Sequence, residues 1–265
     1  MLYYLFLIMK LSMESQTKAH NVDVIDEAFY IPQLDRHRRI WLYRPTDYYH
    51  TEKKYSVIYM HDGQNLFDEA TAFGEEWAVD KTLNGMFAEC IIVAIDSSDH
   101  RLTEYNYNDN EQNGAGEGRQ YMDFIVNTLK PFIDKNFRTD TQREHTHIAG
   151  SSMGGLISLY GAINYPEIFG GAGIFSPSLW LTPNVADELK PLAERNFNFS
   201  QRFYFYGGGQ EGENMVEYIA AVAGMLDNYK HYDVHIEVNS EGVHHEFFWR
   251  NMFPDYYSWL AQGFM

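Results

Sequence analysis

Five residues in the middle of the chain carry the clearest chemical signal. Ser152 lies within Gly150-Ser151-Ser152-Met153-Gly154, between residues typical of a buried strand and residues typical of a helix. A G-x-S-x-G at such a junction is typical of a sharp turn that exposes a serine hydroxyl above a sheet. The glycines permit the strained backbone and close contacts that this turn requires. The pattern therefore predicts a nucleophilic serine for acyl transfer, with a purely structural tight turn as the alternative.

A base and an acid must accompany such a serine, and the expected chain order is serine, acid, histidine. His244 and His245 follow the last predicted strand and precede the last predicted helix. The acid should follow the preceding strand, where Glu211 is the first candidate. Glu213 is the second, because it could instead charge the first turn of the next helix. The glycines before both glutamates are also consistent with a flexible turn and a Ser–His pair that has no carboxylate.

Two backbone N–H groups are predicted to form an oxyanion hole. One belongs to Met153, which follows the nucleophile, and the other comes from the loop after an early strand. Gln64 is the best candidate for this second donor, and Gly63 lets the chain turn there. Asp62, beside this loop, is expected either to hold the loop by hydrogen bonds or to contact substrate.

Strands alternating with helices predict an α/β fold with a mostly parallel sheet covered on both faces. Residues 22–265 are predicted to form a single domain, with residues 1–21 as an N-terminal extension. The first two strands should form an antiparallel edge, and an amphipathic helix is expected at 121–137. A long polar loop at 97–118 is predicted to cover the site. The expected strands are 22–31, 38–43, 55–60, 90–95, 144–150, 173–176, 202–206 and 234–238, and the other expected helices are 75–87, 153–163, 185–195, 215–229 and one from 247.

Composition excludes several classes of function. The chain has 265 residues, 45% of them hydrophobic, and a formal net charge of -17. This charge argues against nucleic acid or an anionic membrane surface as a partner. The single cysteine, Cys90, excludes an intramolecular disulfide and a cysteine zinc site, and its apolar surroundings predict a buried strand. The apolar run at 1–9 is too short to span a bilayer and Lys10 follows it, so we expect a cytoplasmic protein.

Metal binding is not predicted. His145 and His147 alternate on one predicted strand and would face the same side, but no third ligand accompanies them. The loop at 106–118 is rich in Asn, Asp and Glu but lacks the spacing of a calcium loop. We therefore expect a reaction that needs no metal and no organic cofactor.

Several motifs together resemble the esterase family of α/β-hydrolases, which includes enterochelin-type siderophore esterases, feruloyl and acetyl-xylan esterases and S-formylglutathione hydrolases. The resemblance spans roughly residues 25 to 262. The residues that carry it, besides the serine turn, are His61 to Asp68, Gly74 to Trp77, Arg101 with Glu104-Tyr105, Leu129 to Asp134, Arg138-Thr139, and His244-His245-Glu246 with Trp249-Arg250.

This resemblance implies roles for particular residues. It implies an α/β-hydrolase fold, His244 as the base and Gln64 as an oxyanion donor. His245 stands where the family usually has asparagine, so it is the alternative base. The predicted function is a serine carboxylic-ester hydrolase acting through an acyl-enzyme on acylated carbohydrate or aromatic acyl esters. A siderophore-type esterase, a thioesterase and a non-catalytic binding protein are the alternatives. Candidate substrate contacts, each with simple packing as its alternative, are Trp180, Asp62, Arg101 and Tyr105.

Overall fold

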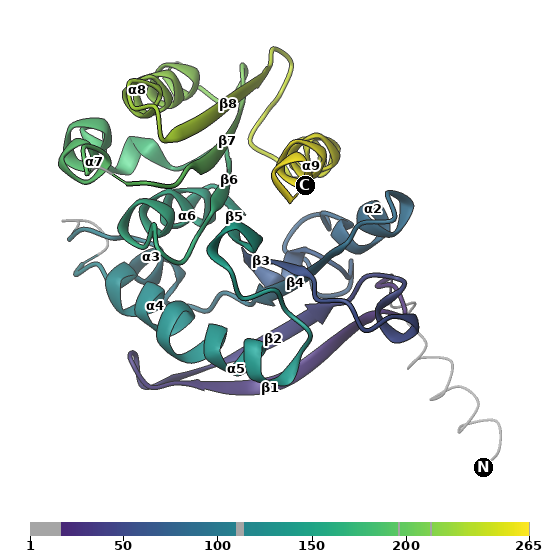
Figure 1. Ribbon diagram of the computed structural model, residues 1–265. Coiled ribbons are helices and arrows are strands. Elements are labelled where there is room, and N and C mark those ends of the chain that lie inside the picture. The colour runs from purple at the N-terminus through teal and green to yellow at the C-terminus, as the bar shows by residue number, and fades with distance from the viewer. Residues whose placement is uncertain (1–16, 110–113, 196, 213, 265) are drawn as a thin grey trace.

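An eight-stranded sheet in the order β1-β2-β4-β3-β5-β6-β7-β8 forms the centre of the molecule (Figure 1). It is seen in a computed structural model that describes residues 17–109, 114–195, 197–212 and 214–264. The β1–β2 and β2–β4 pairs are antiparallel and the other pairs are parallel. The strands are β1 (Val22–Ile31), β2 (Arg36–Tyr43), β3 (Ser56–His61), β4 (Cys90–Ile95), β5 (Thr146–Ser151), β6 (Gly171–Phe175), β7 (Gln201–Gly208) and β8 (Tyr232–Asn239).

Helices cover both faces of the sheet. In Figure 1 the run from α4 to α8 lies on one side of the strands, and α2 and α9 lie on the other. The predicted mostly parallel α/β fold with an antiparallel edge is thus confirmed. The α-helices are α2 (Val79–Gly85), α3 (Arg101–Glu104), α4 (Gly118–Phe124), α5 (Lys130–Asn136), α6 (Met153–Asn164), α7 (Val185–Ala193), α8 (Met215–Asp227) and α9 (Glu246–Ala261); the shorter turns include η2 (Gly63–Asn65), η4 (Arg143–His145) and η5 (Leu179–Leu181).

The core consists of one apolar cluster on each face of the sheet. Along β3, Val57 and Tyr59 belong to one cluster, and Ile58 and Met60 belong to the other. Successive residues of a strand point to opposite faces, so a strand covered on both sides needs apolar residues at every position. Cys90 lies fully buried in β4, as predicted. In the described residues, none of the helices is long and apolar enough to span a membrane.

Three predicted elements differ from the structure. The helix expected at 75–87 begins only at Val79, because Ala78 has φ +52° and interrupts any earlier helical turn. The helix expected at 121–137 begins at Gly118 and contains a π-helical turn at 125–129 between α4 and α5. The loop expected at 97–118 contains α3. The completely buried Glu104 fastens α3 to the sheet through an ion pair of 2.7 Å with Arg38 of β2.

Candidate active site

The turn between β5 and α6 holds Ser152 in a strained backbone conformation. Its φ and ψ are +57° and −122°, a region that residues other than glycine rarely adopt. Its N–H donates to the Phe175 carbonyl at 2.8 Å. A Cβ at Gly150 would lie 2.8 Å from the backbone of Gly154, and one at Gly155 would lie 2.9 Å from the Phe175 carbonyl oxygen. The glycines are therefore needed for close packing, and this packing keeps the serine in place.

The carboxyl ends of the parallel strands meet at the edge of the sheet where Ser152 lies. Parallel sheets bind their ligands at this edge. A cleft of about 730 Å³ opens there, lined by Asp62, Gln64, Asn65, Phe73, Gly74, Ser97, Ser98, Asp99, Arg101, Ser151, Ser152, His244, His245, Glu246 and Trp249. The predicted nucleophile and the predicted base thus face one cavity, although they are far apart in the sequence.

His244 and Glu211 form a hydrogen-bonded pair. His244 Nδ1 lies 2.8 Å from Glu211 Oε2. The Glu211 side chain is completely buried, whereas a third of the His244 side chain is exposed. The other carboxylate oxygen, Oε1, accepts from the Gly208 N–H at 2.7 Å and from the Ser176 hydroxyl at 2.6 Å. Glu211 therefore has hydrogen-bond partners for both oxygens, and its contact with Nδ1 orients the His244 imidazole. Glu213 lies outside the described residues.

His245 has a different role from its neighbour. Its Nδ1 accepts a hydrogen bond of 3.1 Å from the Phe247 N–H and caps the N-terminus of α9. The His244 ring instead packs against two indoles in T-shaped contacts, with centroid distances of 5.8 Å to Trp180 and 5.0 Å to Trp249. Of the two candidate bases, His244 is the one that pairs with the carboxylate.

Contacts with the end of β4 and the residues after it hold η2, the turn that contains the predicted oxyanion donor Gln64. The Gln64 side chain donates to the Ser97 hydroxyl at 2.8 Å and accepts from the Ser97 N–H at 3.0 Å. Gly63 packs so closely on the end of β4 that an added Cβ would lie 3.0 Å from its backbone. Met153 begins α6, so its N–H is one of the first-turn donors that have no acceptor within the helix.

Asp62 and Arg101 form a two-pronged ion pair at the cleft. Arg101 Nε and Nη2 each lie 2.7 Å from a different oxygen of Asp62. Asp62 itself has φ +57°, and its N–H donates to the Tyr105 hydroxyl at 3.3 Å. The pair ties α3 to the turn after β3, which is the structural role that the sequence allowed for Asp62. Both side chains also line the cleft and are placed to contact a ligand.

Tyr105 does not line the cleft, and its prediction as a substrate contact is wrong. It is completely buried and packs against His61 and Tyr121, with ring centroids 5.2 and 5.1 Å away. His61 is also enclosed, and burial lowers its pKa to about 3, so it stays neutral at physiological pH. Trp180 is also absent from the residues that line the cleft, but its side chain is half exposed and its ring lies 5.8 Å from the His244 ring.

Sequence reasoning missed two serines that contact the predicted triad. Ser178 Oγ lies 3.1 Å from Ser152 Oγ, and Ser176 donates to Glu211. In this arrangement the Ser152 hydroxyl pairs with Ser178 and not with His244. The available signal was position, because Ser176-Pro177-Ser178 directly follows β6, the strand beside β5.

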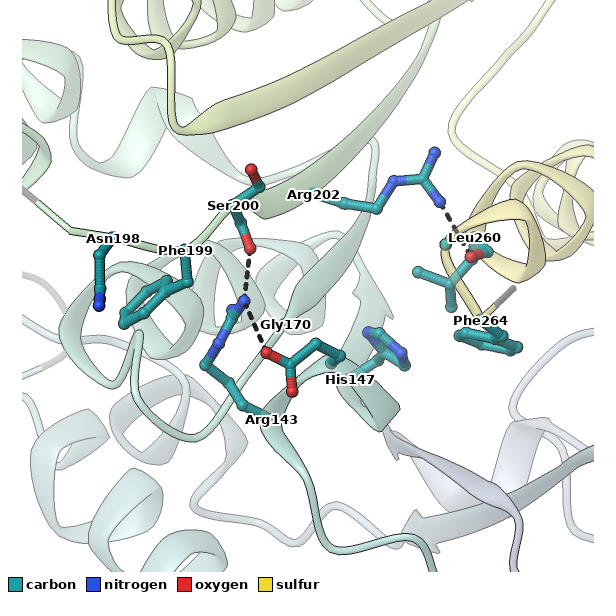
Figure 2. A pocket seen from close by; sticks show the side chains of 11 residues that line it. Arg143, His147, Gly170, Asn198, Phe199, Ser200, Arg202, Leu260 and Phe264 are labelled. Atoms are coloured by element: carbon teal, nitrogen blue, oxygen red, sulfur yellow. Dashed lines mark hydrogen bonds and ion pairs between the residues drawn. The ribbon is translucent and has the colours of Figure 1, made fainter.

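A second cavity of about 420 Å³ lies at the opposite, amino end of the sheet (Figure 2). Arg143, His147 and Arg202 line it. His147 is buried, its pKa is lowered to about 3 by burial, and its ring stacks on Phe264 at 5.3 Å. Arg202 donates to the carbonyls of Trp259 and Leu260, so it anchors the end of α9. In the part of the chain that the structure describes, no three His, Cys, Asp or Glu side chains gather as metal ligands.

Curated relatives share part of the sequence. The chain is 29% identical over 171 residues to the uncharacterized protein YbbA of Bacillus subtilis, a match that covers 60% of this chain and 66% of YbbA. It is 30% identical over 131 residues to the iron(III) salmochelin esterase of Escherichia coli O6:H1, covering 48% of this chain and 29% of that protein. The chain thus matches just under two thirds of the first relative and less than a third of the second.

Solved structures share the fold over nearly the whole chain. The BES protein from Bacillus cereus superposes with a TM-score of 0.75 at 19% identity, covering 93% of this chain and 97% of that one. The enterobactin esterase FES from Shigella flexneri gives 0.75 at 20% identity, covering 94% and 61%. A ferulic acid esterase gives 0.70 at 17% identity, covering 92% and 99%. The family model described as "Putative esterase" matches residues 31–259, and the chain therefore belongs to this esterase family of α/β-hydrolases.

Proposed function

We propose that the protein is a serine carboxylic-ester hydrolase that works through an acyl-enzyme formed on Ser152. The observation that carries this proposal is the buried Glu211 carboxylate, which lies 2.8 Å from Nδ1 of His244, a residue that lines the same cleft as the strained Ser152. A carboxylate so placed selects the imidazole tautomer whose Nε2 accepts a proton. We call Ser152, His244 and Glu211 the proposed triad.

In the proposed reaction, His244 Nε2 takes the hydroxyl proton as Ser152 Oγ attacks the acyl carbon. Ser152 Oγ is hydrogen-bonded to Ser178 in this arrangement, and we expect its contact with His244 to tighten when substrate binds, because catalytic hydrogen bonds often tighten only in the substrate complex. The N–H groups of Met153 and Gln64 stabilise the tetrahedral oxyanion. The C–O bond to the alcohol then breaks, and the proton on His244 passes to the departing alkoxide. Water releases the acyl group by the same steps, which restore Ser152.

Neutral acylated carbohydrates or aromatic acyl esters are the proposed substrates. The cleft carries the carboxylates of Asp62, Asp99 and Glu246 and one arginine, Arg101, which Asp62 already neutralises. Such a cleft repels multiply charged anions and admits neutral esters. The exposed Trp180 offers an apolar face for a sugar or an aromatic ring. Siderophore-type substrates, which the names of two relatives suggest, are the second candidate.

Hydrolysis of a panel of esters tests this proposal. Wild type and Ser152→Ala are compared on p-nitrophenyl acetate, methyl ferulate, acetylated xylo-oligosaccharide and a catecholate tri-ester. We expect wild type to hydrolyse the neutral esters and Ser152→Ala to lose at least 10³-fold in kcat. Retained activity in Ser152→Ala would refute the mechanism. A preference for the tri-ester would assign the siderophore class, and no turnover of any ester would favour a binding protein.

A further inference from the structure

The segment after β6 contacts all three members of the proposed triad. Within Ser176–Trp180, Ser178 lies against Ser152, Ser176 against Glu211, and the Trp180 ring against the His244 ring. The segment is itself fixed to the nucleophile turn, because the Ser178 N–H donates to the Ser152 carbonyl at 3.0 Å. A shift of this segment would therefore disturb the nucleophile, the base and the acid together.

The hydroxyl of Ser178 is enclosed and faces the nucleophile. Ser178 is completely buried, and among the described residues its Oγ pairs with Ser152 Oγ, 3.1 Å away. A buried hydroxyl normally donates to an available acceptor. Donation from Ser178 leaves the Ser152 proton free to be given to His244. The same bond stabilises the negative charge that grows on Ser152 Oγ as this proton leaves.

The direction of the hydrogen bonds at Ser176 is fixed by its neighbours. The Trp249 Nε1–H donates to Ser176 Oγ at 2.8 Å, and an indole nitrogen can only donate. Ser176 must therefore use its own proton for Glu211 Oε1, which lies 2.6 Å away. Ser176 is completely buried and has φ +44°, so its backbone is strained. The chain from Trp249 through Ser176 to Glu211 orients the carboxylate from the helix that follows His244.

We propose that Ser178 is a catalytic residue that donates a hydrogen bond to the nucleophile oxygen, and that Ser176 is a positioning residue that orients Glu211. This inference rests on the proposed function. In acylation, the Ser152 proton moves to His244 and the Oγ–acyl bond forms, while Ser178 keeps its own proton. In deacylation, the bond between the acyl carbon and Ser152 Oγ breaks, and Ser178 stabilises the departing oxygen until His244 returns the proton.

The rate of fluorophosphonate labelling tests Ser178, because it measures the nucleophile without a substrate-binding step. In Ser178→Ala we expect this rate and kcat for p-nitrophenyl acetate to fall about tenfold, the usual worth of one hydrogen bond in rate. KM should stay within twofold. Ser158→Ala is the matched control. Ser158, in α6, is fully buried like Ser178, but its hydroxyl donates to the Gly154 carbonyl and not to the nucleophile. This variant should label at the wild-type rate.

A double-mutant cycle tests Ser176. Ser176→Ala should lower kcat about tenfold in wild type, with KM unchanged, and should have no further effect when Glu211 is already alanine, which removes the oxygen that Ser176 contacts. Additive losses would overturn the positioning role. A Ser178→Ala protein that labels as fast as wild type, or faster, would overturn the catalytic role. If Ser152→Ala itself retained turnover, the proposed function would fail instead, so the two failures are distinguishable.

Discussion

Replacing Glu211 by glutamine removes one negative charge and places an amide NH2 group, which only donates, where Oε2 faces His244 Nδ1. The glutamine carbonyl can still accept from Gly208 and Ser176, so the fold should survive with an unchanged Tm. Two things are lost: the acceptor that selects the imidazole tautomer with Nε2 unprotonated, and the attraction between the carboxylate and the imidazolium that forms when His244 takes the serine proton. The attraction alone sets the minimum loss. Two unit charges about 4 Å apart attract by about 4 kcal/mol at an effective dielectric constant of about 20. The Glu211 side chain is fully buried, but a third of the His244 side chain is exposed. We therefore expect the lost attraction to raise the activation free energy by about 3–4 kcal/mol, which lowers the rate about 10²–10³-fold.

The assay is kcat/KM for p-nitrophenyl acetate at pH 8. Glu241→Gln is the matched control, because Glu241 is an exposed glutamate in the same loop as His244. We expect the control to behave as wild type and Glu211→Gln to lose about 10²–10³-fold. A loss below tenfold in a protein with wild-type Tm would refute the argument, since the enzyme would then work with a Ser–His pair alone.

Three further perturbations follow from the geometry. Burial raises the pKa of the Asp96 carboxyl from 3.8 to about 6, so the folded protein holds its proton more tightly than the unfolded chain does. This binding stabilises the folded protein fully below about pH 4, and the stabilisation is lost as the pH rises above about 6. Asp96→Asn should therefore raise the free energy of unfolding by about 2–3 kcal/mol at pH 8 and by nothing near pH 4, as measured by urea unfolding. His245→Ala should cost about 1 kcal/mol through the lost cap on Phe247 but retain ester hydrolysis, measured as Tm and kcat. Arg101→Met should lower stability by about 3 kcal/mol in urea, because Asp62 would be left buried without its partner.

The sequence predicted the parts of the site that depend on neighbours along the chain. The strand, the glycines and the helix around Ser152 are adjacent in the sequence, so one short segment contains all the residues whose packing the turn requires. The same holds for His244, which directly precedes the helix that His245 caps. The apolar run around Cys90 likewise predicted a strand buried on both faces, because no position in it had to face water.

The features that the sequence did not reveal arise from contacts between distant segments. Helix α3 forms within a polar loop because Glu104 pairs with Arg38 of β2, a contact that local patterns do not show. Tyr105 was expected in the cleft, but the rings of His61 and Tyr121 enclose it. Ser178 reaches Ser152 only because β6 lies beside β5 in the sheet.

Covalent labelling shows whether His244 activates Ser152, the step on which the proposed reaction depends. Intact-mass spectrometry after a fluorophosphonate probe would compare wild type with Ser152→Ala, His244→Ala and His245→Ala. We expect one adduct on wild type and on His245→Ala, and none on Ser152→Ala or His244→Ala. An adduct on Ser152→Ala, or labelling that survives loss of His244 but not of His245, would contradict it.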